Sequence, residues 1–366
     1  MCGISGVMRF DDTIVSEEMI VKMRDALAHR GPDGAGVYID KHIGLGHRRL
    51  SIIDLSENGK QPFTTKDGRY TISFNGEIYN YNEFYVELKK KGIQFHSSSD
   101  TEVLLYLYIV YGPAMLNRLN GMWAFAIWDN VEQTLFLCRD RLGVKPLYYT
   151  IWNNALYFAS EQKALFAAGV PLQIESKHFS ELFFYRFVSG QNTLFSNVFK
   201  LLPGHYMQVD VGAKPKITRY WHLGERSSVA RIEGDVYEWF EYHFNRSVKY
   251  RMVSDAPVGV LLSGGLDSSS VIYSLYAQNF KKINSFTIRF TEGDLDESKI
   301  AEKLSTKLGF TPHTLLIEGD LLLDNLKKAV WAHDEPLIHH SDPHLVGIAN
   351  YSCSHRCPVI SVKKRT

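Results

Sequence analysis

The spacing of apolar residues changes along this chain, and the change limits the folds that it can adopt. Before about residue 205, segments such as 122–129, 134–140 and 146–152 alternate apolar and polar residues with a period of two, which predicts strands. After about residue 235, strand-like and helix-like segments follow one another in turn. The first pattern predicts an α+β domain of sheets covered by helices. The second predicts an α/β domain with a parallel, doubly wound sheet.

Length and composition agree with two globular domains. The chain has 366 residues, of which 45% are hydrophobic and 22% are charged, so each domain can bury a core of its own. We place the first domain at residues 2–205 and the second at residues 236–366. Residues 206–235 between them are polar and mixed in charge, and we interpret them as a linker.

Charge, hydropathy and cysteine content narrow the classes of partner. The formal net charge is +1 and no basic stripe stands out, so nucleic acid is not an expected partner. The longest apolar run, at 103–111, is about half as long as a membrane span, so no membrane partner is expected either. Four irregularly spaced cysteines and an N-terminus without signal-peptide features predict a reducing, cytoplasmic location.

A short motif in the second domain predicts an anion-binding site. The strand-like segment 257–262 leads into SGGLDSS at 263–269, where a helix begins. Two glycines allow a tight turn, the first amides of a helix attract anions, and serine hydroxyls add donors. Asp267 is unsuited to touching phosphate directly but could hold Mg²⁺ against it. No Lys-Ser/Thr pair of a Walker-type loop is present.

The N-terminus carries a second candidate site. If the initiator methionine is removed, Cys2 presents a free α-amine and a thiol on one residue. Free α-amines have a pKa of about 7.7–8.0 and thiols of about 8.5, so such an amine can accept the proton of the thiol near neutral pH. Taken alone, a cysteine at position 2 could equally be a chance feature of the sequence.

Both candidate sites fit one resemblance. SGGLDSS resembles the pyrophosphate loop of the ATP pyrophosphatase superfamily, and MCGISG resembles the start of class II glutamine amidotransferases, which are N-terminal-nucleophile hydrolases. The motifs HRGPDG, RLSIID, NGEIYN and SDTEV follow in the amidotransferase order. Together the two halves resemble the glutamine-hydrolysing asparagine synthetases and their relatives, from residue 2 to about residue 340.

The resemblance implies a fold and a reaction. The fold would be an αββα sandwich followed by an incomplete α/β domain of the ATP-pyrophosphatase type. Glutamine would be hydrolysed at the cysteine, and the ammonia would react with an ATP-activated, adenylated aspartate to give asparagine, glutamate, AMP and pyrophosphate. The partners implied are glutamine, aspartate or another carboxylate, ATP and Mg²⁺. Members of the family often form homodimers.

The resemblance also assigns roles to residues. Cys2 would be the nucleophile, and the side chain of Asn75 and the backbone N–H of Gly76 would form the oxyanion hole. The glutamine pocket would further contain Arg49 for the α-carboxylate, Glu77 and Asp100 for the α-ammonium, and the backbone of Leu50, Ser51, Ile52 and Ile53. ATP would contact Leu262, Ser263, Gly264, Gly265, Asp267, Ser268 and Ile288, with Asp267 reaching Mg²⁺ through phosphate and Glu335 as a further acid of the synthetase site.

The C-terminal part departs from the family pattern. After the strand-like segment 357–362 the chain reads KKRT, without the second glycine- and acid-rich loop with which the family holds ATP and Mg²⁺. We therefore expect a truncated synthetase domain with exposed apolar surface and impaired activity. A reading-frame change near residues 340–350 would explain why the last residues look unlike the family.

Histidines and cysteines near the C-terminus do not predict a metal site. Cys353 and Cys357 flank His355, but a single C-x-x-x-C with one histidine and no second cluster is a weak zinc signal. His339 and His340 are expected to be loop residues.

Four functions are compatible with these residues. They are an asparagine synthetase, a related synthetase that amidates another carboxylate, a glutaminase whose synthetase half is defective, and a non-catalytic protein on a dead enzyme frame. The intact set of glutaminase residues disfavours the last, because a dead frame has no physical reason to keep them together. We favour the first.

Overall fold

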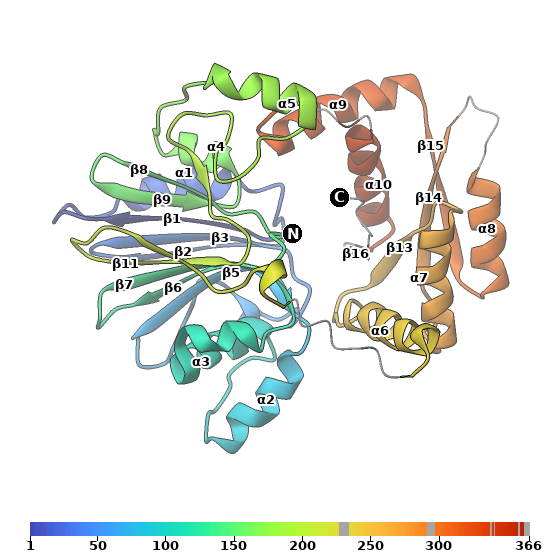
Figure 1. Ribbon diagram of the computed structural model, residues 1–366, viewed down its shortest axis with the longest axis horizontal. Helices are drawn as coiled ribbons and strands as arrows, with labels where there is room; N and C mark the ends of the chain where they lie inside the picture. Colours follow the sequence, from blue (N-terminus) through green and yellow to red (C-terminus); the bar gives the residue numbers. More distant parts are fainter. Residues whose placement is uncertain (227–233, 291–296, 337–338, 340, 358, 362–366) are drawn as a thin grey trace. The chain divides into compact units, whose positions relative to one another are not determined.

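The computed structural model describes residues 1–226, 234–290, 297–336, 339, 341–357 and 359–361. The chain divides into two compact units, residues 1–228 and 229–366 (Figure 1). Within the described residues, no helix is both long enough and apolar enough to span a membrane.

Two antiparallel sheets of six strands form the first unit. The first sheet has the order β10-β8-β9-β1-β3-β2 and the second has the order β12-β11-β7-β6-β5-β4. The strands of the first sheet are β1 (Gly3–Arg9), β2 (Gly34–Asp40), β3 (Ile43–Arg49), β8 (Tyr148–Trp152), β9 (Ala155–Ala159) and β10 (Phe199–Lys200). Those of the second are β4 (Phe63–Thr64), β5 (Tyr70–Ile78), β6 (Gly121–Asp129), β7 (Thr134–Arg139), β11 (His205–Asp210) and β12 (Lys216–Arg219).

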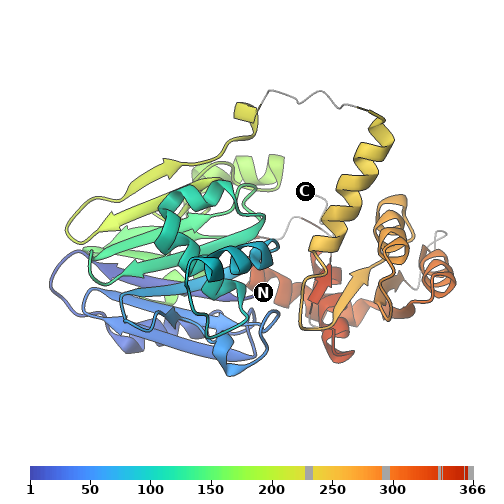
Figure 2. The same ribbon diagram turned by 90° about the horizontal axis from the view of Figure 1, so that it is seen from below.

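Helices cover the outer faces of both sheets. The helices of this unit are α1 (Glu17–Asp25), α2 (Tyr81–Lys90), α3 (Asp100–Tyr111), α4 (Gln162–Ala167) and α5 (Phe179–Tyr185), with short 3₁₀ helices at Glu57–Gly59, Gly112–Asn117, Ser176–His178 and Leu223–Arg226. α1 and α4 pack on the first sheet and α2 and α3 on the second, so four layers are stacked (Figure 1). In Figure 2, seen from below, α2 and α3 lie in front of the sheets. The predicted αββα sandwich is confirmed.

β6 shows why its sequence, GMWAFAIWD, is apolar on both faces. Trp123, Phe125 and Ile127 belong to the core between the second sheet and its helices. Ala126 and Trp128 belong to the core between the two sheets. Because successive side chains of a strand point to opposite faces, a strand in the middle of a sandwich must be apolar at every position.

The expected linker at residues 206–235 is wrong over its first part. β11 pairs with β7, and β12 pairs with β11, so both strands belong to the second sheet. Met207 and Val209 are fully buried, whereas Gln208 and Asp210 between and after them are exposed. Near the edge of a sheet only one face of a strand is buried, and the polar residues of the other face give such a segment the composition of a linker.

The second unit is built on a four-stranded parallel sheet of the order β15-β14-β13-β16. Its strands are β13 (Val258–Leu261), β14 (Asn284–Phe290), β15 (Thr311–Ile317) and β16 (Val359–Ser361), and its helices are α6 (Val236–Tyr250), α7 (Leu266–Ala277), α8 (Glu297–Lys307), α9 (Gly319–His333) and α10 (Asp342–Ser354). α6, α7 and α8 share a core with one face of the sheet, and α10 packs on the other face with α9 against it (Figure 1). Helices on both faces confirm the predicted doubly wound sheet.

We predict that the core between the two sheets of the first unit is sensitive to cavities. Replacing the fully buried Trp128 with alanine should lower the free energy of unfolding of this unit by about 3–5 kcal/mol, because transfer free energy and packing are lost together. Urea titration followed by far-UV circular dichroism measures the change. Val131→Ala, at a side chain that is 64% exposed, is the matched control, and equal effects of the two substitutions would contradict the layered packing.

Candidate active site

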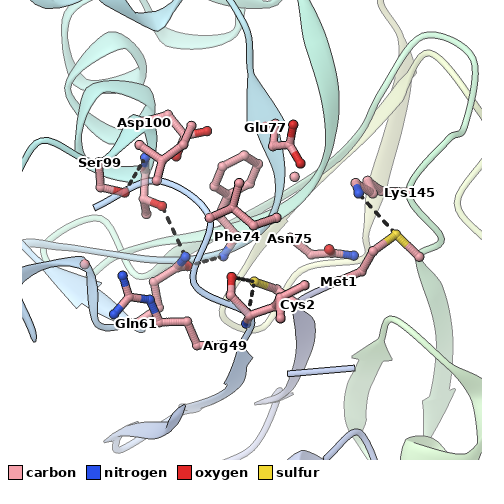
Figure 3. A pocket seen from close by; sticks show the side chains of 16 residues that line it. Met1, Cys2, Arg49, Gln61, Phe74, Asn75, Glu77, Ser99, Asp100 and Lys145 are labelled. Carbon is pink, nitrogen blue, oxygen red and sulfur yellow. Dashed lines mark hydrogen bonds between the residues drawn. The ribbon is translucent and has the colours of Figure 1, made fainter. Parts of the chain in front are cut away.

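A pocket in the first unit brings together the ends of several elements. Cys2 precedes β1, Arg49 ends β3, Asn75 and Glu77 lie near the end of β5, and Asp100 begins α3 (Figure 3). The pocket is lined by Met1, Cys2, Arg49, Leu50, Ile52, Ile53, Gly59, Gln61, Phe74, Asn75, Gly76, Glu77, Ser99, Asp100, Thr101 and Lys145. All the residues expected at the glutamine site are therefore neighbours except Ser51, whose N–H donates to Asp33 Oδ2 at 2.8 Å outside this lining.

The chain terminus is held at the edge of this pocket. β1 is paired on both sides, with β9 and with β3, so the residue before it has a fixed position. Sγ of Cys2 lies 3.4 Å from the backbone nitrogen of Leu50 and 3.6 Å from its carbonyl oxygen. Arg30 Nε donates to the carbonyl of Cys2 at 2.8 Å, and the amine of Met1 donates to the carbonyl of Arg30 at 2.9 Å.

Arg30 is itself fixed by a buried carboxylate. Its Nη1 donates to Glu161 Oε1 at 2.7 Å, and His29 Nε2 lies 2.9 Å from Oε2 of the same carboxylate. Lys163 is a further partner. Burial alone would raise the pKa of Glu161, but the hydrogen bond from His29 and the charges of Arg30 and Lys163 outweigh burial and lower it to about 2. The HRGPDG motif thus connects the chain terminus to Glu161, just after β9.

Asn75 and Gly76 present groups suited to stabilising an oxyanion. Asn75 is 1% exposed and lines the pocket, and its Nδ2 has no hydrogen-bond partner within the described residues. A buried donor without a partner is costly unless a ligand uses it. Gly76 is required by space, since a Cβ there would lie 2.2 Å from the carbonyl oxygen of Met122 on β6.

The strand that carries Asn75 is fixed at the preceding residue. The backbone N–H of Phe74 donates to Gln61 Oε1 at 2.7 Å, and Gln61 Nε2 donates to Thr101 Oγ1 at 3.1 Å. On the carbonyl side, His47 Nε2 lies 3.0 Å from the oxygen of Phe74. Burial lowers the pKa of His47 to about 4, so the ring is neutral and Nε2–H is the donor. Two side chains therefore fix the peptide next to Asn75.

Arg49 and Asp100 supply opposite charges to the same pocket. Two N–H groups of Arg49 donate to the backbone carbonyls of Asp54 and Ser56, which set the direction of the guanidinium. Asp100 Oδ2 accepts from the N–H of Ile78 at 2.9 Å. Burial, together with the negative charge of Glu77, raises the pKa of Asp100 to about 7 in spite of that hydrogen bond. A cationic group of a ligand could therefore pair with the carboxylate of Asp100, which ionises near neutral pH.

Sequence analysis missed several residues of this pocket. They are Gly59, Gln61, Phe74, Ser99, Thr101 and Lys145. Gln61 could have been suspected only from its place before Pro62, and Lys145 lies in RDRLGVKPLYY, where the sequence does not say which of three cations is buried. Their contribution depends on which loops meet, and spacing along the chain does not carry that information.

In the second unit, the SGGLDSS loop lies where the sequence predicted. Its first three residues follow β13 and its last four open α7, at the carboxyl end of the strand that adjoins β16. With the strand order β15-β14-β13-β16, this is the point at which the connections change direction, where open α/β sheets bind their ligands. The strand expected at residues 357–362 is present as β16, Val359–Ser361.

Hydrogen bonds inside the loop shape it. Ser268 Oγ accepts from the N–H of Ser263 at 3.2 Å and lies 3.1 Å from its Oγ, and Ser263 Oγ accepts from the N–H of Gly265 at 3.4 Å. Gly264 has a φ of +79°, and a Cβ there would lie 2.8 Å from the carbonyl oxygen of Glu297. A glycine is therefore needed both for backbone conformation and for space.

The other residues expected around the nucleotide differ in exposure. Leu262 is buried, and its N–H and carbonyl are bonded to the carbonyl of Phe286 and the hydroxyl of Thr287. Ile288 lies two residues after Phe286 on β14 and is partly buried, Asp267 is exposed in the first turn of α7, and Glu335 follows the end of α9. The described residues contain no group of three His, Cys, Asp or Glu side chains that could hold a metal ion.

The C-terminal histidines and cysteines have structural contacts. The ring of His355 lies 4.6 Å from that of His313 and 4.4 Å from that of Tyr351. Cys357 is buried and accepts a hydrogen bond from Asn284, whereas Cys353 is exposed. His339 lies in the loop before α10, where its carbonyl accepts from the N–H of Asp342, and His340 lies outside the described residues.

We predict that the carboxylate of Glu161 stabilises the first unit in a pH-dependent way. Glu161→Gln should lower the free energy of unfolding by about 3–5 kcal/mol at pH 7, because buried cations lose their counter-charge. Since the pKa of Glu161 falls from 4.5 to about 2 on folding, this stabilisation is complete above about pH 4.5 and is lost as the pH falls toward 2. Urea titrations at several pH values should show the difference between wild type and variant shrinking below pH 4.5. Glu18→Gln, on an exposed pair with Lys22, should change nothing, and a pH-independent effect of Glu161→Gln would contradict the assignment.

Comparison with known proteins assigns both halves of the chain. The family described as glutamine amidotransferase domain matches residues 1–221, and the family described as asparagine synthase matches residues 240–357. The second match continues past residue 340, which corrects the expectation that the resemblance ends there.

Individual relatives agree with these matches. Glutamine-hydrolysing asparagine synthetase 1 of Bacillus subtilis is 37% identical over 347 residues, covering 92% of this chain and 53% of the relative. Amidase chry2 of Gibberella zeae is 34% identical over 92% of this chain and 54% of the relative. A Methanocaldococcus jannaschii protein, provisionally named as a glutamine-hydrolysing asparagine synthetase, is 36% identical over 93% of this chain and 70% of its own length. The chain thus spans about half the length of the first two relatives, and it belongs to the family of glutamine-hydrolysing asparagine synthetases, in which a glutamine amidotransferase domain precedes an asparagine synthase domain.

Proposed function

We propose that the first unit hydrolyses glutamine at Cys2 and that the ammonia is used by the second unit to amidate an ATP-activated aspartate. The products would be asparagine, glutamate, AMP and pyrophosphate. The observation that carries this proposal is the pocket lined by Cys2, Asn75, Arg49 and Asp100, in which Asn75 Nδ2 has no hydrogen-bond partner among the described residues.

Glutamine binding would use the opposite charges of the pocket. Arg49 would pair with the α-carboxylate, an arrangement in which an arginine fork forms strong charge-assisted hydrogen bonds. Asp100 and Glu77 would pair with the α-ammonium. The side chain of glutamine would then extend toward Cys2, with its carboxamide oxygen near Asn75 Nδ2 and the N–H of Gly76.

Hydrolysis would proceed through a thioester. After removal of Met1, the α-amine of Cys2 accepts the thiol proton, and the sulfur attacks the carboxamide carbon, whose oxygen becomes an oxyanion held by Asn75 and Gly76. The oxyanion collapses, the C–N bond breaks, and the α-ammonium returns its proton to the leaving group, which departs as ammonia. Water, deprotonated by the same amine, then attacks the thioester, releasing glutamate and the thiol.

The second unit would bind ATP at the SGGLDSS loop. The first amides of α7 and the hydroxyls of Ser263 and Ser268 would face the phosphates, and Leu262 and Ile288 would adjoin the adenosine. ATP supplies the adenylyl group that activates the carboxylate. Asp267 is a single carboxylate, so it would hold Mg²⁺ only together with phosphate oxygens and water, which is the usual mode for this ion.

A second candidate function is amidation of a carboxylate other than aspartate. Amidase chry2 is 34% identical over 92% of this chain, and asparagine synthetase 1 of Bacillus subtilis is 37% identical over the same share. Relatives with different names are thus similar to this chain to nearly the same degree. Incubation with glutamine and Mg-ATP, with and without aspartate, separates the two functions. AMP and asparagine formed in equal amounts support asparagine synthesis, whereas glutamate formed without asparagine points to another acceptor or to a glutaminase alone.

Cys2→Ala should abolish glutamate formation from glutamine, because the nucleophile is lost. Ammonia-dependent formation of asparagine should be retained, because the second unit does not use the thiol. Glutamate and asparagine are quantified with glutamine or ammonium chloride as nitrogen source, and intact mass should show that Met1 is absent from the active protein. Cys353→Ser, at an exposed cysteine of the second unit, should keep the glutaminase activity. A fully active Cys2→Ala enzyme would refute the mechanism.

The KM for glutamine should rise as the pH falls below about 7. Asp100 is protonated below its raised pKa of about 7, and a neutral carboxyl cannot pair with an ammonium. Asp100→Asn should raise the KM at pH 8 by about 100-fold, equivalent to about 2.7 kcal/mol, and remove most of the pH dependence. Steady-state glutaminase assays from pH 6 to 8.5 measure both effects, with the exposed Asp12→Asn as control. A KM that stays constant over this range would argue against Asp100 as the ammonium partner.

A further inference from the structure

Lys145 is a buried cation of the glutaminase pocket that the proposed reaction does not use. It lies between β7 and β8 and is 3% exposed. In the described part of the chain its ammonium donates to a single atom, Sδ of Met1, at 3.3 Å, and no carboxylate lies at ion-pair distance (Figure 3). Burying an ammonium without such a partner is costly, so its retention in the pocket needs an explanation.

Neighbouring side chains bind both the backbone N–H and the backbone carbonyl of Lys145. Asp140 Oδ2 accepts from the N–H of Lys145 at 2.9 Å, and Arg139 Nε donates to the carbonyl of Lys145 at 2.8 Å. Asp140 Oδ1 also accepts from the N–H of Val144 at 2.9 Å. Two charged residues thus fix the point from which the lysine side chain extends toward the N-terminus.

The charged groups around this ammonium are few and mixed in sign. Burial lowers the pKa of Lys145, the negative charges of Glu77, Cys2 and Asp140 oppose this, and the positive charge of Arg30 adds to it. In the chain that still carries Met1, burial lowers the pKa of the Met1 amine to about 5. The charges of Cys2 and Glu77 oppose this shift, and those of Arg30 and Lys145 add to it. Lys145 therefore interacts electrostatically with Cys2 and with the chain terminus, and the terminal amine becomes that of Cys2 once Met1 is removed.

We propose that Lys145 is a positioning residue for the nucleophile. After Met1 is removed, the ammonium of Lys145 faces the amine and the sulfur of Cys2. It favours the thiolate and disfavours protonation of the amine. The inference deepens the proposed glutaminase function and rests on it. A cation beside a thiol favours the reactive anion, and an amine that resists protonation is free to take the thiol proton at neutral pH. The conjugate acid of such an amine is also a better proton donor to the departing ammonia.

The pH profile of Cys2 alkylation tests this inference without requiring turnover. Processed protein is treated with iodoacetamide from pH 6 to 10, and modification of the N-terminal peptide is followed by mass spectrometry. Lys145→Met, which removes the charge and keeps the length, should move the half-maximal pH upward by about one unit. Lys145→Arg should stay within a few tenths of a unit of wild type, because it keeps the charge. Lys22→Met, at an exposed lysine of α1, should match wild type.

Steady-state kinetics give a second readout. Lys145→Met should lower kcat of glutamine hydrolysis by at least about 10-fold with little change in KM, since binding of the α-groups does not involve Lys145. An alkylation profile of Lys145→Met that superimposes on wild type would overturn the inference, as would a Lys145→Arg profile shifted as far as that of Lys145→Met. Lys145→Gln provides the neutral side chain should Lys145→Met not fold. A wild-type protein that shows no glutamine hydrolysis would refute the proposed function, whereas the alkylation profiles would still decide the role of Lys145.

Discussion

The candidate active site depends on one constraint: the proposed nucleophile, Cys2, is next to the chain terminus, so the terminus has to be held in a fixed place. β1 meets this requirement because it is paired on both sides within the first sheet. Arg30 completes it by binding the carbonyl of Cys2, and Glu161 fixes Arg30 in turn. Without this arrangement the first residues would fray, as chain ends usually do, and no catalytic geometry could be kept.

The rest of the pocket is organised around β5 and the start of α3. Asn75 and Gly76 lie on β5, where the N–H groups of Phe74 and Ile78 donate to Gln61 and Asp100 respectively. Because Gln61 also bonds Thr101, the residue after Asp100, hydrogen bonds connect β5 to the first turn of α3 on both sides of Asn75 and Gly76. A change at one of the two would be felt at the other, which is a reason to treat the pocket as a unit.

Much of the fold could be predicted because its periodicities are strong. Alternating segments became the strands of a sandwich, and the strand–helix alternation became a doubly wound sheet, with the SGGLDSS loop at the predicted edge. The error at residues 206–219 arose because an outer strand of a sheet buries only one face and looks polar on average. The motif residues of the proposed glutamine site were found through resemblance, and nearly all of them line one pocket.

By itself, the sequence determined which chemistry this chain can carry: a cysteine next to the terminus, an arginine, an amide and two acids in a fixed order, and a glycine-rich loop at a strand end. Only the tertiary structure decided that Gln61 and His47 fix the backbone of Phe74 and that Asp100 is buried with its pKa raised. It also decided that Lys145 is buried in the pocket of Cys2, with its ammonium at Sδ of Met1. The physical reason is that burial and charge–charge distance depend on how distant loops pack. Local sequence encodes periodicity and motif, but it contains no measure of the distance between a loop at residue 145 and a terminus at residue 2.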